Sequence, residues 1–170
     1  MSRLTRDFFL RDVLEVAPDL LNCSIVLPYN NQQASYIITE VEAYKGEEDL
    51  ACHASKGRTR RTEIMYGKGG HLYIYLIYGM YYMLNIVTGE ADNPQAVLIR
   101  GIQGYNGPGK LTRHLKIDKS YYGLDICNSD KLWIENKKRI LPYHTSPRIG
   151  IEYAGEKWAG KPWRFYINTF

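Results

Sequence analysis

The spacing of apolar and polar residues predicts a chain of many short strands with few helices. Apolar residues at helical spacing predict a helix that begins at Thr5 or Asp7 and stops before Pro18, and a second short helix that begins at this proline. A further helix is expected from about Lys110 to Ile117. Segments rich in β-branched and aromatic residues, bounded by turn residues, predict the strands. These are Ser24–Leu27, Ser35–Tyr44, Leu72–Tyr78, Met80–Val87, Ala96–Arg100, Lys131–Ile134, Arg148–Ile151 and Trp163–Ile167.

Short connections between successive strands indicate antiparallel pairing. The expected fold class is therefore α+β, with a curved antiparallel β-sheet as core, peripheral helices and one protruding β-hairpin. A long loop at residues 45–70 precedes that hairpin, and loops of such length in a compact domain are usually functional. With 170 residues, the chain has the size of one domain, and we expect residues 1–170 to form it.

Composition excludes disorder and adds one unusual feature. Hydrophobic residues make up 45% of the chain and charged residues 24%, which are ordinary globular values. Tyrosine, however, occurs 15 times and phenylalanine only 4 times. Because a tyrosine ring can stack while its hydroxyl stays hydrogen-bonded, the excess raises the question of aromatic stacking.

The uncharged stretch Gly69–Gly89 approaches the ~20 apolar residues that a membrane span needs. Its many tyrosines, with His71 and Asn85, would be costly against lipid, so two strands folded about Gly79 explain the stretch better. Charges in the first residues argue against a signal peptide, and the cysteines include no CxxC pair. We therefore expect no membrane association and an intracellular location, which in a bacterium is the cytoplasm or nucleoid.

Strand alternation brings two carboxylates and an aromatic ring to one side of the segment Tyr36–Tyr44. Glu40, Glu42 and Tyr44 share that face with Tyr36 and Ile38. A solvent-facing strand is the favoured interpretation for Glu40. The alternative is a general base beside a stacking platform, and burial distinguishes the two because a buried glutamate tends toward a raised pKa.

Neither a metal site nor a nucleotide-binding loop is expected. The four histidines form no HExxH motif and no cluster with cysteines, so we expect no metal and no cofactor. The segment Gly104–Leu111 resembles a P-loop but has Leu111 where that motif needs a serine or threonine, so a Gly-Pro turn that starts a helix is favoured. Lys110 at that helix start could still hold a nucleic-acid phosphate.

The net charge of +4 favours anionic partners without proving one. From charge alone, the basic residues of the loop at 56–61 and of the helix at 110–119 are more simply interpreted as solvated surface. Tyr78, at the hairpin tip beside Gly79, suits a wedge between base pairs, whereas tyrosines in strands are usually half-buried sheet residues. Composition does not decide between these two interpretations.

Taken together, the motifs resemble the alkyladenine (3-methyladenine) DNA glycosylase family. The matching blocks lie in the family's order and cover nearly the whole chain. They are Glu40–Tyr44, Ala51–Ala54, Gly57–Thr59, Tyr73–Met80, Asn85, Val97–Arg100, Gly107–Leu111 and Arg164–Tyr166.

This resemblance implies a role for each matching residue. Glu42 corresponds to the general base that activates water, and Arg100 to an arginine that supports the active site. Tyr44, His53, Tyr75 and Asn85 correspond to the pocket for the flipped base, in which the asparagine excludes guanine. Tyr78 corresponds to the side chain that enters the minor groove, and the remaining expected DNA contacts are Arg58, Thr59, Arg61 and Lys110.

The implied activity is that of a monofunctional glycosylase in base excision repair. It would flip alkylated purines, with deaminated purines as further candidates, out of double-stranded DNA and leave an abasic site. Lesions such as 3-methyladenine, 7-methylguanine, hypoxanthine and ethenoadenine fit the same pocket outline. We expect a monomer whose partner is DNA containing damaged purines. The alternative is a non-catalytic nucleic-acid-binding module, and a P-loop enzyme is disfavoured by Leu111.

Three residues depart from the family's pattern in the loop before the hairpin. Arg60 and Thr62 stand where the family usually has proline and asparagine, and Gly69 stands where it has proline. These departures concern the loop's backbone and its grip on DNA rather than the catalytic assignment.

Overall fold

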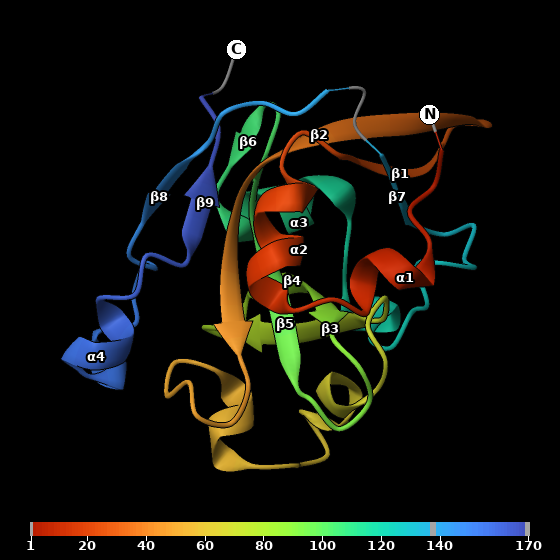
Figure 1. The fold of residues 1–170 in the computed structure, drawn as a ribbon. Coiled ribbons are helices and arrows are strands. Elements are labelled where there is room, and N and C mark those ends of the chain that lie inside the picture. The colour runs from red at the N-terminus through yellow and green to blue at the C-terminus, as the bar shows by residue number, and fades with distance from the viewer. Residues whose placement is uncertain (1, 137–138, 169–170) are drawn as a thin grey trace.

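A curved antiparallel sheet that does not close into a barrel organises residues 2–136 and 139–168, the part of the chain that the computed structural model describes. Its strands are β1 (Ser24–Tyr29), β2 (Gln32–Lys45), β3 (Leu72–Ile77), β4 (Tyr81–Thr88), β5 (Gln95–Ile102), β6 (Tyr105–Asn106), β7 (Trp133–Glu135), β8 (His144–Ser146) and β9 (Arg164–Tyr166). The order is β3-β4-β5-β2-β1-β7, with β6 beside β5, β9 beside β2 and β8 beside β9 (Figure 1). The predicted α+β class is confirmed.

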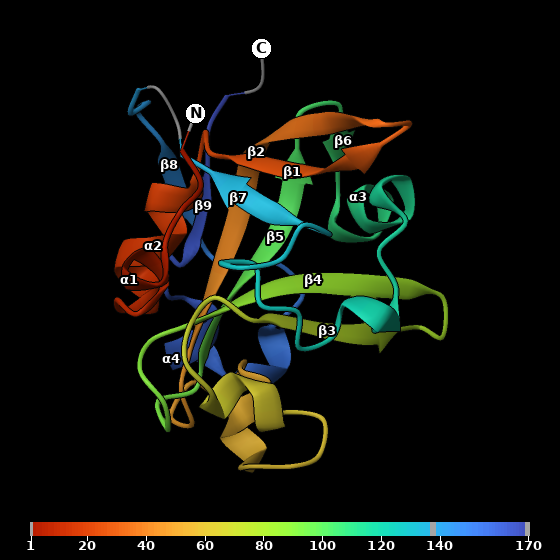
Figure 2. The same ribbon diagram turned by 90° about the vertical axis from the view of Figure 1, so that its right-hand side faces the viewer.

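Helices lie at the periphery of this sheet. The α-helices are α1 (Arg6–Phe9), α2 (Val13–Leu20), α3 (Pro108–Leu115) and α4 (Glu156–Ala159), and the 3-10 helices are η1 (His53–Lys56), η2 (Glu63–Tyr66), η3 (Lys119–Tyr121) and η4 (Glu152–Ala154). Figure 2 shows α1 and α2 on one side of the molecule and α3 on the opposite side. The long loop at residues 45–70 contains η1 and η2.

The predicted boundary between the first two helices is wrong. The first helix ends at Phe9, and the second begins after Asp12, whose Oδ1 accepts a hydrogen bond of 2.8 Å from the backbone N–H of Leu14. Pro18 lies inside α2 rather than at the start of a helix. An N-cap satisfies a donor that the first turn leaves free, whereas one proline near the end of a helix removes a single hydrogen bond. The cap therefore sets the boundary.

Most predicted strands are present with shifted ends, but Arg148–Ile151 is not a strand. Arg148 lies in a buried ion pair with Asp49 instead, and the strand that pairs with β9 is β8. The first hairpin is longer than predicted, because β1 and β2 meet at a turn whose residues Asn30 and Asn31 have φ values of 47° and 61°. Asparagine tolerates this left-handed backbone, which a tight hairpin turn requires.

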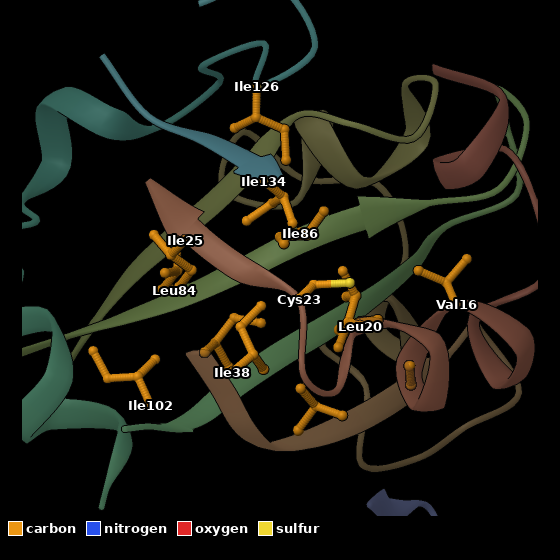
Figure 3. Packing of buried hydrophobic residues seen from close by; sticks show 14 of the residues in the cluster. Val16, Leu20, Cys23, Ile25, Ile38, Leu84, Ile86, Ile102, Ile126 and Ile134 are labelled. Atoms are coloured by element: carbon orange, nitrogen blue, oxygen red, sulfur yellow. The ribbon is translucent and has the colours of Figure 1, made fainter. Parts of the chain in front are cut away.

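Apolar side chains from both helices and strands form the main core beneath the sheet. Figure 3 shows the convergence of Val16 and Leu20 from α2, Ile25 from β1, Ile38 from β2, Leu84 and Ile86 from β4, and Ile102 from β5, together with Cys23, Ile126 and Ile134. All are nearly or completely buried. This core fixes β2, β4 and β5, the strands that carry most of the site described below.

Because β2 contains a β-bulge, the prediction of which residues share one face of this strand is wrong. The register against β5 shifts on both sides of Glu40, so Ile38 packs in the main core instead of sharing a face with Glu40, Glu42 and Tyr44. A bulge re-aims the side chains that follow it. Here it turns the two carboxylates and the tyrosine away from the core.

Close packing explains why glycine occupies position 69. Its backbone N–H donates to the carbonyl of Gly89 at 2.9 Å, a bond that proline cannot form. A Cβ atom at this position would lie 2.1 Å from the carbonyl oxygen of Phe9. The departure from the family's proline therefore accompanies a close approach of α1 to the loop before β3.

The hairpin of β3 and β4 confirms that residues 69–89 fold back as strands. Its tip is a tight turn in which Tyr78 and Gly79 have φ values of 53° and 65°, closed by a hydrogen bond of 3.1 Å from the N–H of Met80 to the carbonyl of Ile77. Among the described residues, no helix has the length and apolar character to span a membrane.

Candidate active site

Glu42 is a fully buried carboxylate held on both of its oxygens. Its Oε1 accepts a hydrogen bond of 2.8 Å from the Tyr44 hydroxyl, and its Oε2 accepts one of 2.7 Å from the backbone N–H of Ile149. The guanidinium of Arg100 lies 3.8 Å from the same Oε2. Burial raises the pKa of Glu42, and Arg100 and the two hydrogen bonds oppose this effect without cancelling it. A buried carboxylate with a raised pKa is poised to accept a proton.

Glu40 is not the solvent-facing residue that the sequence predicts. Its side chain is 17% exposed, and its Oε1 accepts hydrogen bonds from Nε of Arg100 at 2.9 Å and Nε of Arg164 at 2.8 Å. Despite desolvation, the two guanidinium groups lower the pKa of Glu40. The pKa values of Glu40 and Glu42, two glutamates of one strand, are thus shifted in opposite directions.

The four residues predicted for a base pocket line one cavity. Tyr44, His53, Tyr75 and Asn85 surround a volume of about 50 Å³, which is room for a few water molecules. Tyr73 and other side chains complete the wall. The pocket brings together β2, η1, β3 and β4, so its members come from elements far apart in the sequence.

Burial and nearby cations keep His53 uncharged. Desolvation, with Arg61 and Lys56, lowers the pKa of His53 to about 4. Its Nδ1 lies 2.7 Å from the Tyr73 hydroxyl, and this contact fixes the imidazole ring in the pocket wall. The ring therefore acts at neutral pH as a hydrogen-bonding group without charge.

Both predicted stacking tyrosines already have an arginine over one ring face. Cζ of Arg148 lies 4.9 Å from the ring centroid of Tyr44, and Cζ of Arg61 lies 5.0 Å from that of Tyr75. Arg61 is exposed, whereas the Arg148 side chain is completely buried. The ring of Tyr75 also contacts the rings of His53 and Tyr73, with centroids 4.6 and 5.3 Å away.

The ion pair of Arg148 and Asp49 anchors the loop that reaches Glu42. Two guanidinium nitrogens of Arg148 lie 2.6 and 2.9 Å from the two carboxylate oxygens of Asp49, and both side chains are completely buried. This loop supplies the N–H of Ile149 to Glu42. A fork-to-fork pair of this kind fixes orientation as well as position.

A wider groove of about 1090 Å³ lies beside the pocket, and Tyr44, His53 and Tyr75 line both. Tyr78 borders it from the hairpin tip with 84% of its surface exposed. Lys110, at the start of α3, lines the same groove with Arg113 and Arg100. Cations beside an exposed aromatic ring are suited to a polyanion with stacked bases.

The loop residues predicted to contact DNA differ in the partners that they have within the protein. Arg58 forms ion pairs with Glu63 at 2.8 Å and Asp92 at 3.4 Å. Thr59 forms hydrogen bonds with Thr62, whose hydroxyl accepts from the Thr59 N–H at 2.9 Å. Thr62, a departure from the family's asparagine, thus helps to hold the backbone of this loop.

Among residues 2–136 and 139–168, no group of three or more histidine, cysteine, aspartate or glutamate side chains could hold a metal ion. The chemical groups described at this site are carboxylates, guanidinium groups and aromatic rings.

Sequence reasoning missed several members of this site. Arg164 falls in a matching motif, but the motif does not indicate its contact with Glu40, and Ile149 acts through its backbone N–H, which carries no residue-type signal. Tyr73 and Tyr153 line the pocket as well. Only Tyr73 had a usable signal, because strand alternation places it on the same side as Tyr75.

Comparison with known proteins identifies relatives of the chain. The sequence model of the family described as methylpurine-DNA glycosylase matches residues 7–105 and 103–169. A protein of Methanocella arvoryzae is 44% identical over 186 residues, covering 98% of this chain and 92% of that protein. Proteins of Desulfitobacterium hafniense and Rickettsia felis are 42% and 43% identical over 99% and 97% of this chain, and over 96% and 93% of their own lengths. Each of the three is named "Putative 3-methyladenine DNA glycosylase".

Proposed function

The chain belongs to the methylpurine-DNA glycosylase family, and from this premise we propose that it excises damaged purines from double-stranded DNA. The reaction is hydrolysis of the N-glycosidic bond, which leaves an abasic site in an intact strand. Alkylated purines are the primary substrates and deaminated purines are further candidates. We propose that residues 1–170 act as one glycosylase domain and as a monomer.

The observation that carries this proposal is the environment of Glu42. A buried carboxylate with a raised pKa, beside an aromatic pocket and an arginine, suits a general base for water. Glu42 would accept a proton from the water that attacks C1′ of the deoxyribose, while the base departs with the electrons of the glycosidic bond. Arg100 would hold the water or the departing group in line with the sugar.

Access to C1′ requires that the nucleotide leave the duplex, which costs a few kcal/mol. Stacking against Tyr44 and Tyr75 at about 1–3 kcal/mol per ring contact can offset that cost. Tyr78 would fill the space that the base has left, as the wedges of minor-groove proteins do. Because the cavity has room for only a few water molecules, a base can enter only if side chains that line it, such as the exposed Tyr153, move aside.

Hydrolysis by water alone suits the substrates proposed. Alkylated purines such as 3-methyladenine and 7-methylguanine are cationic, so they leave readily and are attracted to the tyrosine rings. No lysine is among the described residues that line the pocket. We therefore propose a monofunctional enzyme without lyase activity.

The experiment that tests the proposal is incubation of the protein with methylated duplex DNA. We expect release of free 3-methyladenine and strands that break only after treatment with alkali, because the abasic product is left uncut. Unmethylated DNA of the same sequence is the control. Binding without any release of base would support the non-catalytic nucleic-acid-binding module instead, and cleavage without alkali would contradict the monofunctional assignment.

A further inference from the structure

Glu40 and Arg164 form a cluster with Arg100 that borders Glu42 and that the proposed reaction does not use directly. We propose that Glu40 and Arg164 are positioning residues, which hold Arg100 beside Glu42 while keeping its Nε hydrogen-bonded to Glu40 instead of to Glu42. This inference rests on the proposed function, because it concerns how the base for that reaction keeps its strength.

The distances place Nε of Arg100 between two carboxylates. It lies 2.9 Å from Oε1 of Glu40 but 3.8 Å from Oε2 of Glu42. The same Oε1 of Glu40 accepts the second guanidinium, from Arg164, at 2.8 Å. The arginine is thus hydrogen-bonded to Glu40 and only close to Glu42.

The position of Arg164 is itself fixed by the sheet. On β9, Arg164 is the cross-strand partner of Glu42, and Tyr166 is the partner of Glu40. Its guanidinium donates to the hydroxyl of Ser146 on β8 at 2.8 Å. The pairing of β9 with β2 therefore brings this cation to the same carboxylate oxygen of Glu40 that accepts from Arg100.

The balance of charges in this cluster determines how strongly the two arginines act on Glu42. Two carboxylates and two guanidinium groups are grouped here, and the side chains of Glu40, Arg100 and Arg164 are 17%, 16% and 22% exposed, so water screens them only partly. Without Glu40, both cations would have Glu42 as their remaining carboxylate. Glu42 would then form a closer, hydrogen-bonded ion pair, its pKa would fall, and it would be a weaker base.

The other groups described near Glu42 do not supply a negative charge in place of that of Glu40. Tyr44 on β2 and the N–H of Ile149 bond to it, and Tyr75 on β3 and Tyr153 on η4 are neutral neighbours. The remaining cation, Arg148, is neutralised by Asp49. The charge of Glu40, by contrast, raises the pKa of Glu42.

The test is the pH dependence of single-turnover excision, with protein saturating over a duplex that carries one lesion. Glu40→Gln keeps the acceptor oxygen but removes the charge. We expect its acid limb to move to lower pH, by about one unit, and its plateau rate to fall about tenfold, because a more acidic carboxylate is a weaker base. Arg164→Gln removes a cation, so its limb should move to higher pH.

Opposite shifts separate positioning from a purely structural role, which would lower the rate and leave both limbs in place. Asp130→Asn, which removes a fully exposed carboxylate paired with Arg3, is the matched control and should keep the wild-type profile. Limbs that stay at the wild-type pH, or that both move in one direction, would overturn the inference. If one variant does not fold, the direction in which the acid limb of the other variant moves supports or overturns the inference. Absence of excision by the wild type would instead overturn the proposed function.

Discussion

At the scale of single residues, Tyr78 combines an exposed ring with an unfavourable backbone. Its side chain is 84% exposed and its φ is 53°, in the left-handed region that favours glycine and asparagine. Such a conformation costs about 1–2 kcal/mol for a residue with a Cβ atom. Neither property stabilises the free protein, so both agree with the proposed role as a wedge that acts only in bound DNA.

Replacement of this residue should therefore separate stability from binding. Asparagine suits the first position of this turn before glycine, so Tyr78→Asn should keep or raise the free energy of unfolding, by up to about 1 kcal/mol. Its affinity for a duplex with an abasic site should fall about tenfold, because the stacking of one ring is lost. Urea denaturation and a binding titration measure the two effects. Tyr78→Phe keeps the ring and should bind like the wild type; equal affinity of Tyr78→Asn would count against the wedge.

Residue types in ordered motifs predicted most of the candidate site, because Glu42, Tyr44, His53 and Tyr75 lie together as the resemblance implied. The misjudged residue, Glu40, has partners 60 and 124 positions away. No local pattern shows that a charged strand residue will meet two arginines brought in by β5 and β9. Such a contact follows from sheet topology.

At the scale of elements, the loop between β8 and η4 depends on one buried ion pair. Arg148 and Asp49 have completely buried side chains, and the adjacent N–H of Ile149 bonds to Glu42. Predicting this segment as a strand was wrong because its apolar residues alternate like those of a strand, while the arginine that decides its path has its partner 99 residues away.

Loss of one partner should destabilise the protein strongly. Arg148→Met would leave the carboxylate of Asp49 buried without its cation, and we expect the free energy of unfolding to fall by about 3–5 kcal/mol. Urea denaturation measures this change. Glu63→Gln breaks the exposed pair with Arg58 and should cost no more than about 1 kcal/mol. A loss for Arg148→Met as small as that of the control would show that the pair does not anchor the loop.

Local sequence signals predict some of the remaining elements and not others. The α+β class, the hairpin about Gly79 and the helix after the Gly-Pro turn follow from periodicity and turn residues. The bulge at Glu40 and the helix boundary at Asp12 do not, because each is decided by a hydrogen-bond arrangement that competes with the periodic pattern.

At the scale of the whole molecule, the burial of His53 links stability to pH. Its folded pKa of about 4 lies below the ordinary value of 6.5, so the unfolded chain binds a proton more readily. The stability that comes from the neutral ring is fully present above about 6.5 and is lost as the pH falls toward about 4.

Urea denaturation over this pH interval should show a declining free energy of unfolding in the wild type. His53→Gln has no group that titrates at this position, and its decline over the same interval should be smaller. Parallel curves for the two proteins would mean that His53 does not keep its neutral form in the folded state.

The central claim, that Glu42 is the general base, is tested most directly by single-turnover excision with Glu42→Gln. Glutamine keeps the size of the side chain but cannot accept the proton from water. We predict a rate at least about 100-fold below that of the wild type, with unchanged affinity for a duplex that contains an abasic site. Excision by Glu42→Gln at the wild-type rate would contradict the account.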